Sequence, residues 1–135
     1  MKRKTVERTR NSGTMTEAEF KSFVISALRN ASRFWKPKQA CIKKARVSYN
    51  SYRCSQCNAI WPSKLPPLPW KKRKRHNITA DHIVEIVPKE GFTTYDSWIE
   101  RCFVEEEGWQ ALCWECDQKK TQEHQQERRE ERKKN

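Results

Sequence analysis

Six cysteines are the residues of this chain whose type and spacing point most directly to chemistry. Four of them form two C-x-x-C pairs with 55 residues between the pairs. Such pairs are typical either of a disulfide-bonded secreted domain or of a tetrahedral zinc site with thiolate ligands. The basic start of the chain is followed by no apolar signal region, so we favour zinc. The expected ligands of one structural Zn²⁺ are Cys54, Cys57, Cys113 and Cys116.

The other two cysteines, Cys41 and Cys102, stand among apolar neighbours. Free cysteine behaves as a small hydrophobic residue when nothing activates its thiol. We therefore expect both to be buried thiols and assign neither of them to the zinc site.

A second candidate centre lies between the two cysteine pairs, at Asp81 and His82. Hydrolysis of a phosphodiester needs a base that activates water and a cation that stabilises the developing oxyanion. The imidazole of His82, with an ordinary pKa near 6.5, suits a general base at neutral pH. The carboxylate of Asp81 offers a hard oxygen ligand for Mg²⁺ or Mn²⁺. An Asp-His pair alone is weak evidence, and its position between two zinc knuckles gives it weight.

The charge of the chain is large and unevenly distributed. It has 29 Lys and Arg against 17 Asp and Glu, a net charge of +12. Residues 1–80 carry a net charge of +17, whereas residues 81–112 carry −6. A block of this kind predicts a polyanionic partner, nucleic acid before a membrane surface, and we expect double-stranded DNA. The densest basic run is expected to contact phosphates, although a solvated loop is the alternative; it comprises Lys71, Lys72, Arg73, Lys74 and Arg75.

The composition excludes a membrane-spanning protein and a large core. Hydrophobic residues make up 35% of the chain, and mean hydropathy is −1.11. No apolar run approaches the roughly 18 residues of a spanning helix, and no lipidation motif is present. We expect a cytoplasmic protein. Six Trp and five Phe can form a small core that needs a metal as a staple.

The first half of the chain is expected to be mainly helical. Residues 1–14 are basic and polar and predict a disordered arm. Thr16 and Glu19 form a capping box that starts a helix, whose apolar stripe is expected to pack in a core. A second short helix is expected over residues 38–46, so that residues 15–50 form an N-terminal helical segment. Four prolines between Pro62 and Pro69 predict a stiff loop.

The second half predicts strands between the cysteine pairs and a helix after them. Residues 59–61 and 78–83 favour strands, the latter continuing toward Val87 before a loop closed by Pro88 and Gly91. Residues 95–107 favour an amphipathic helix that ends at Gly108. A short extended segment over 109–112 then leads into the second knuckle. The chain from Trp114 onward favours a helix, and residues 122–135 form a charged extension or tail.

The order of these features resembles the HNH endonuclease family, the ββα-metal nucleases with a four-cysteine zinc scaffold. Among its members the closest resemblance is to small HNH proteins encoded by phages and prophages, which would place the protein in the host cytoplasm. The resemblance covers residues 16–121. It implies an α+β fold with a nuclease core over residues 51–121. It also implies that Asp81 binds the catalytic metal and that His82 is the general base.

Two positions depart from the family pattern. The place of the last His, directly after the second knuckle, holds Asp117, and the place of the middle Asn holds Gly108. A carboxylate binds Mg²⁺ as well as an imidazole does, so we expect Asp117 to share the metal with Asp81. Gln110 or Asn77 is expected to take the orienting role of the missing Asn.

The sequence therefore predicts a metal-dependent DNA endonuclease with structural Zn²⁺ and catalytic Mg²⁺ or Mn²⁺. One alternative is a zinc-stapled DNA-binding protein with a degenerate nuclease site. The departures from the family pattern at Asp117 and Gly108 support this alternative. Another is a protein-interaction module that uses the charged C-terminal helix and the proline-rich loop. The sequence shows no signature of a dimer.

Overall fold

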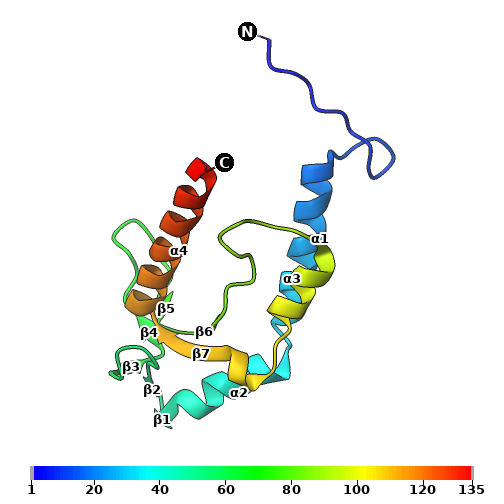
Figure 1. Ribbon diagram of the computed structural model, residues 1–135. Helices are drawn as coiled ribbons and strands as arrows, with labels where there is room; N and C mark the ends of the chain where they lie inside the picture. The colour runs from blue at the N-terminus through cyan, green and yellow to red at the C-terminus, as the bar shows by residue number, and fades with distance from the viewer. Residues whose placement is uncertain (1, 135) are drawn as a thin grey trace. The chain divides into compact units, whose positions relative to one another are not determined.

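The computed structural model describes residues 2–134, which form two compact units that divide between Phe34 and Trp35. Met1 and Asn135, the outer ends of the predicted arm and tail, lie outside the described residues. Within residues 2–134 there are four α-helices and three small antiparallel sheets, which confirms a mixed helix and sheet fold (Figure 1). None of these helices is long and apolar enough to cross a membrane.

The N-terminal unit is built around helix α1, Glu17–Ser32. The Thr16 hydroxyl accepts a hydrogen bond from the Glu19 backbone N–H, which confirms the predicted start of the helix. Before the helix, Arg10 pairs with Met15 in a short bridge and its guanidinium binds Glu17 at 2.8 Å. The apolar stripe forms no closed core within this unit, because Phe23 is 62% exposed.

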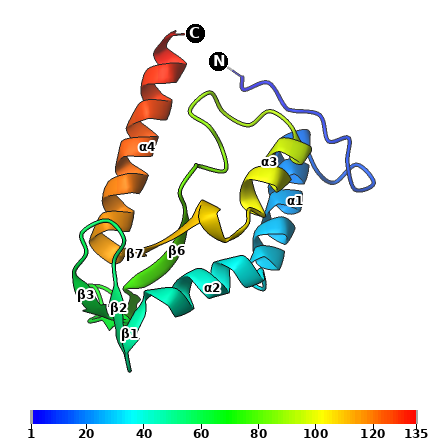
Figure 2. The same cartoon turned by 60° about the horizontal axis from the view of Figure 1, so that its bottom comes forward.

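The second unit is centred on an antiparallel pair of strands, β6 (Ile78–His82) and β7 (Trp109–Cys113). Asp81 lies opposite Gln110 and His82 opposite Trp109. Helix α2 (Lys36–Ala45), with Pro37 in its first turn, packs against both strands. Helix α4 (Trp114–Lys134) continues directly from β7 and also contacts both strands (Figure 2). The predicted helices around 38–46 and from Trp114, and the strand over 109–112, are confirmed.

Two further small sheets flank this pair of strands. Strands β1 (Arg46–Ser48), β2 (Ser51–Arg53) and β3 (Ile60–Pro62) form one antiparallel sheet in that order. The first cysteine pair lies in the turn between β2 and β3. Strands β4 (Lys64–Leu65) and β5 (Arg75–His76) form a two-stranded sheet; the first four residues of the basic run lie in the loop between them, and its last residue, Arg75, begins β5.

The helix predicted over residues 95–107 ends early. Helix α3 covers Tyr95–Cys102, and a 3₁₀ turn follows at Glu106–Gly108. The Val104 carbonyl accepts hydrogen bonds from the indole nitrogens of Trp35 at 2.7 Å and Trp109 at 3.0 Å. These bonds draw the chain out of the helix. Gly108 is required here for close approach rather than as a helix cap, since a Cβ atom would lie 2.5 Å from Val104 Cγ2.

The strand predicted over residues 78–87 also ends early, at His82, and residues 83–94 form an irregular loop. Side chains from two helices hold this loop. Arg101 of α3 donates to the carbonyls of Glu85 and Ile86. His124 of α4 hydrogen-bonds to the Val87 carbonyl at 3.0 Å. The loop is therefore anchored on both sides, and its backbone polar groups find partners other than a third strand.

The core of the second unit is small. Its buried residues form one cluster of Cys41, Trp109 and Ala111, and a second of Cys54, Leu112 and Cys113. Cys41 and Cys102 are buried, as predicted. Two of the three members of the second cluster belong to the cysteine pairs, so this part of the core depends on the state of their sulfur atoms.

Candidate metal centre and catalytic site

The two cysteine pairs come together at one point. The four sulfur atoms all lie within 4.8 Å of one another, and Sγ of Cys57 is 3.9 Å from Sγ of Cys113. A tetrahedral zinc with Zn–S bonds of about 2.3 Å separates its sulfurs by about 3.8 Å. The predicted ligand set therefore has the spacing of a metal site; its members are Cys54, Cys57, Cys113 and Cys116.

The first knuckle is shaped by local backbone hydrogen bonds. The Cys54 N–H donates to the Ala59 carbonyl at 3.0 Å, and the Asn58 N–H donates to the Cys54 carbonyl at 2.9 Å. Asn58 adopts a left-handed conformation with φ of 60°, which asparagine tolerates better than most residues. The turn therefore returns the chain from β2 to β3 and leaves both sulfurs on one side.

The second knuckle is held by a buried asparagine. Asn77 is 1% exposed, and its side chain accepts from the Trp114 N–H at 3.0 Å and donates to the Pro62 carbonyl at 3.0 Å. It thereby caps the start of α4 and ties it to β3. Asn77 therefore has a structural role at the second knuckle, and it is not one of the described residues that hydrogen-bond to Asp81.

Electrostatics at Cys57 favour a thiolate. The Ala59 backbone N–H, followed by the Trp61 indole, lowers the pKa of Cys57 to about 7. The Trp61 indole nitrogen is buried, and no acceptor among the described residues meets it with hydrogen-bond geometry. Burial, followed by the neighbouring cysteines, raises the pKa of Cys116. A cation that four thiolates share would offset this cost, and the donor set fits Zn²⁺.

The carboxylate of Asp81 lies in a charged cluster between β6 and α4. Lys120 Nζ lies 2.5 Å from Asp81 Oδ2 and 3.5 Å from Glu85 Oε1, and it also contacts the His82 carbonyl. The Gln110 side chain donates to Asp81 Oδ2 at 3.2 Å. Of the two predicted orienting residues, Gln110 is therefore the one that contacts Asp81. The ammonium of Lys120 is surrounded by oxygen atoms, so its position is one that a metal cation could also occupy.

Asp117 belongs to the same cluster. Burial, followed by the negative charge of Asp81, raises the pKa of Asp117, whereas Lys120 opposes this effect. Among residues 2–134, the four cysteines are the one group of metal-binding side chains whose ligand atoms lie within 4.8 Å of one another. Lys120 thus lies beside both Asp81 and Glu85, and Asp117 is close enough to these three residues for their charges to affect its pKa.

His82 lies at the end of β6 on the other face of the strand pair. Its ring stacks on Trp109 with centroids 3.9 Å apart, and Nε2 lies 2.8 Å from the Cys102 carbonyl. A carbonyl only accepts, so Nε2 carries the proton and Nδ1 carries the lone pair. Burial lowers the pKa of His82, and Lys38 adds to the effect. The imidazole is therefore neutral at pH 7.

The strand alternation separates Asp81 from His82. Successive side chains of a strand point to opposite faces, so Asp81 points toward α4 and His82 toward α2. Both residues nevertheless lie at the same end of β6, where the strand pair gives way to the loop. The structure thus brings together Asp81 and Asp117, and it places His82 beside them at the end of the strand rather than within the carboxylate cluster.

The predicted DNA-binding run divides into two kinds of residue. Lys71, Lys72, Arg73 and Lys74 are exposed. Arg75 is used within the fold, because its Nε donates to the Pro66 carbonyl at 2.9 Å and its guanidinium lies over the Trp114 ring. Four of the five side chains are therefore free to meet phosphates.

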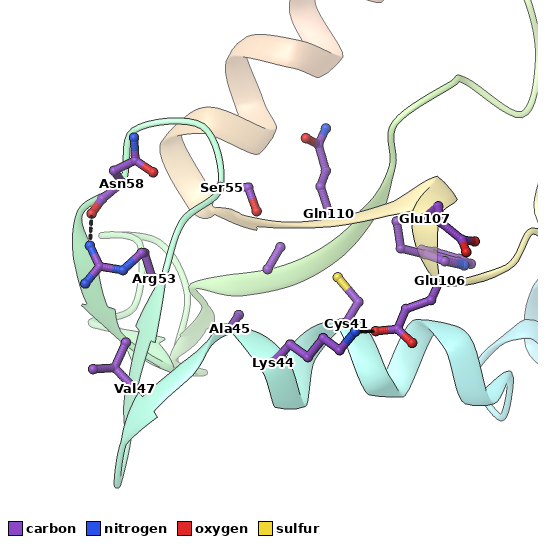
Figure 3. Close-up of a pocket in the computed structure, with 12 residues that line it drawn as sticks. Cys41, Lys44, Ala45, Val47, Arg53, Ser55, Asn58, Glu106, Glu107 and Gln110 are labelled. Carbon is purple, nitrogen blue, oxygen red and sulfur yellow. Dashed lines mark hydrogen bonds and ion pairs between the residues drawn. The ribbon is translucent and has the colours of Figure 1, made fainter.

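A cavity of about 590 Å³ opens beside α2 and the first knuckle. Figure 3 shows Cys41 and Lys44 of α2 beneath β7, with the side chain of Lys44 paired to Glu106 and that of Gln110 pointing away from α2. Glu106 and Glu107 offset the charge of Lys44 and Arg53 on its walls. The cavity lies on the α2 face of β7, whereas the carboxylates of Asp81 and Asp117 face α4.

Three residues of the site were not assigned a role from the sequence: Glu85, Lys120 and Trp61. Lys120 follows Asp117 by three residues on a helix, which places the two side chains on one face. That spacing could have identified Lys120 as a neighbour of Asp117 from the sequence. Glu85 and Trp61 carried no such signal, because their roles depend on how the loop after β6 and the strand β3 fold back.

Comparisons with protein-family models, with curated proteins and with solved structures found no match.

Proposed function

We propose that this protein is a metal-dependent endonuclease that hydrolyses phosphodiester bonds of DNA. The observation that carries the proposal is that Asp81 and Glu85 share the ammonium of Lys120 close to Asp117, at the end of β6 where the neutral imidazole of His82 lies on the other face of the strand. The proposal is also supported by the antiparallel pair of β6 and β7, which is followed by α4 and joined to the four-cysteine cluster; α3 and a 3₁₀ turn lie between the two strands in the chain.

Asp81 and Asp117 would hold Mg²⁺ or Mn²⁺, with Glu85 as a further oxygen donor. When bound, such an ion supplies positive charge to the leaving oxygen and the phosphate. Carboxylates are the ligands that these hard cations prefer. Gln110 keeps Asp81 oriented through its side-chain amide. Lys120 must withdraw from Asp81 before the carboxylate can bind another cation.

His82 would act as the general base. Its hydrogen bond to the Cys102 carbonyl keeps Nε2 protonated, so Nδ1 accepts the proton of the attacking water. Attack at phosphorus in line with the 3′ oxygen breaks the P–O3′ bond and leaves 5′-phosphate and 3′-hydroxyl ends. Lys38, whose ammonium lies 5.7 Å from the centre of the Trp109 ring, is a nearby contact for a phosphate.

The charge of the second unit supports DNA as the substrate. Residues 35–80 contain twelve Lys or Arg and no Asp or Glu. Such residues neutralise phosphates and release counterions, which gives affinity without sequence selection. The exposed side chains of residues 71–74 are the strongest candidates for this contact.

Cleavage of supercoiled plasmid by the zinc-loaded protein tests the proposal. Nicked or linear DNA is expected with Mg²⁺ or Mn²⁺ and none when EDTA is added just before the DNA. His82→Ala should bind zinc and DNA as the wild type does and should not cut, because neither binding event uses the imidazole. Equal cutting by wild type and His82→Ala would remove His82 from the mechanism.

One observation favours a second function, that of a DNA-binding protein without nuclease activity. Lys120 already occupies the cation position beside Asp81, and a lysine that never leaves would replace the metal permanently. In that case the wild type would shift DNA in a gel in a salt-dependent manner and would leave plasmid intact with every divalent ion.

A further inference from the structure

The loop between β4 and β5 presents one aromatic side chain in an unusual way. Trp70 is 76% exposed, and it is the one exposed tryptophan of six, all of which lie in the described residues. Tryptophan is ordinarily well buried, because its large apolar ring gains most from leaving water. The exposure of the Trp70 indole does not stabilise the fold, so it needs another explanation.

The loop is stiff, so the position of Trp70 is defined. Three prolines, at 66, 67 and 69, restrict the backbone before it. The Lys71 N–H donates to the Leu68 carbonyl at 2.9 Å and closes a turn around Trp70. At the base of the loop, Arg75 Nε donates to the Pro66 carbonyl.

The loop is also anchored to the metal centre of the same unit. The Arg75 guanidinium lies 4.6 Å from the centre of the Trp114 ring, and Trp114 stands between the zinc ligands Cys113 and Cys116. Asn77 binds the Trp114 backbone N–H. The exposed indole is therefore held on a rigid support rather than on a free tail.

The residues that follow Trp70 define its partner. Lys71, Lys72, Arg73 and Lys74 are all exposed and carry no compensating acidic neighbour within residues 51–80. A planar ring beside a row of cations matches nucleic acid, in which stacked bases lie between two lines of phosphates. A membrane surface would call for a wider apolar face, and Trp70 is the one large exposed apolar side chain of this loop.

We propose that Trp70 is a wedge that inserts between bases of DNA, while Lys71–Lys74 hold the flanking phosphates. The inference rests on the proposed function insofar as it requires DNA binding. Insertion of an apolar side chain unstacks a base step and bends the duplex. The protein should therefore prefer duplexes that are easily opened, such as those with an abasic site or a mismatch, to a fully paired duplex of the same length.

The experiment uses the zinc-loaded full chain without added Mg²⁺, so that no DNA is cut. Trp70→Ala should weaken DNA binding by about tenfold, because stacking on a base typically contributes an effect of this size or larger. The dependence of affinity on salt should stay the same, since no charge is removed. Trp70→Phe should retain part of the affinity. Tyr49→Ala, which removes another exposed aromatic ring at 88% exposure, should change nothing.

Fluorescence of 2-aminopurine placed at successive positions of a duplex provides the direct readout. Wild type should raise it at one or more positions by unstacking the base, and Trp70→Ala should not. If wild type binds DNA tightly and Trp70→Ala shows the same affinity and the same 2-aminopurine fluorescence, the wedge is refuted and the proposed function is not. No DNA binding by wild type would refute the proposed function together with the wedge. Binding of anionic lipid vesicles that depends on Trp70 would overturn the assignment to nucleic acid.

Discussion

Replacement of Lys120 by Met should make the thermal stability of the protein depend on Mg²⁺ that binds at the acidic cluster of Asp81, Glu85 and Asp117. The change removes the ammonium that lies 2.5 Å from Asp81 and keeps an unbranched side chain that is one atom shorter. Asp81 then keeps its hydrogen bond from the Gln110 amide and faces the negative charge of Asp117. A divalent ion can enter without displacing a lysine.

The size of the effect follows from the burial of the pair. The side chains of Lys120 and Asp81 are 24% and 21% exposed, so the pair lies between a surface pair and a buried one. Its removal should cost about 1–3 kcal/mol in the free energy of unfolding. For a unit of this size each kcal/mol lowers Tm by about 4–8 °C. Mg²⁺ at about 100 times its Kd should then restore about 2.7 kcal/mol.

Thermal unfolding of the zinc-loaded proteins with and without Mg²⁺ measures this effect. Lys119→Met is the matched control, because Lys119 is the exposed neighbour on the same helix. The Tm of Lys120→Met should rise with Mg²⁺ more than that of wild type or control, and the addition of Asp117→Asn should abolish most of the rise. An equal response of Lys120→Met and wild type would refute the assignment of this position to a divalent cation.

Three further results are expected. Zinc binding should release protons and weaken steadily as pH falls through neutrality, because protons compete for the thiolates, above all at Cys116, whose pKa burial raises; a titration in buffers of different pH measures this. Gly108→Asn, which introduces the residue usual in HNH endonucleases, should destabilise the fold by about 1–3 kcal/mol in urea unfolding, because its Cβ would meet Val104. The acid limb of cleavage should lie below pH 6.5, since burial lowers the pKa of His82 and the neutral base persists to lower pH; a limb above 6.5 would contradict this.

Local patterns were the part of the fold that the sequence could predict. The C-x-x-C spacing, the Thr16 cap and the extended segment before Cys113 depend on a few neighbouring residues, and the structure confirms them. The early end of α3 depends on the indoles of Trp35 and Trp109, which both donate to the Val104 carbonyl, and Trp35 lies 69 residues from Val104 in the sequence. No periodicity in residues 95–107 carries that information.

The candidate site was predictable in part for the same reason. Asp81 and Asp117 could be selected by residue type and by their places beside the cysteine pairs. The contact of Lys120 with Asp81 spans 39 residues, and a chain with 29 Lys and Arg offers many equivalent partners. The separation of Asp81 from His82 follows from strand alternation once β6 is known to continue through His82.

Plasmid cleavage by variants of Asp117 tests the proposed nuclease activity most directly. In the presence of Mg²⁺ and with zinc bound, wild type should cut supercoiled DNA and leave 5′-phosphate ends. Asp117→His, which offers the ligand usual in HNH endonucleases, should keep activity, whereas Asp117→Ala should lose most of it. A wild type that binds zinc and DNA and cuts with neither Mg²⁺ nor Mn²⁺ would contradict the nuclease function, and full activity of Asp117→Ala would contradict the metal site.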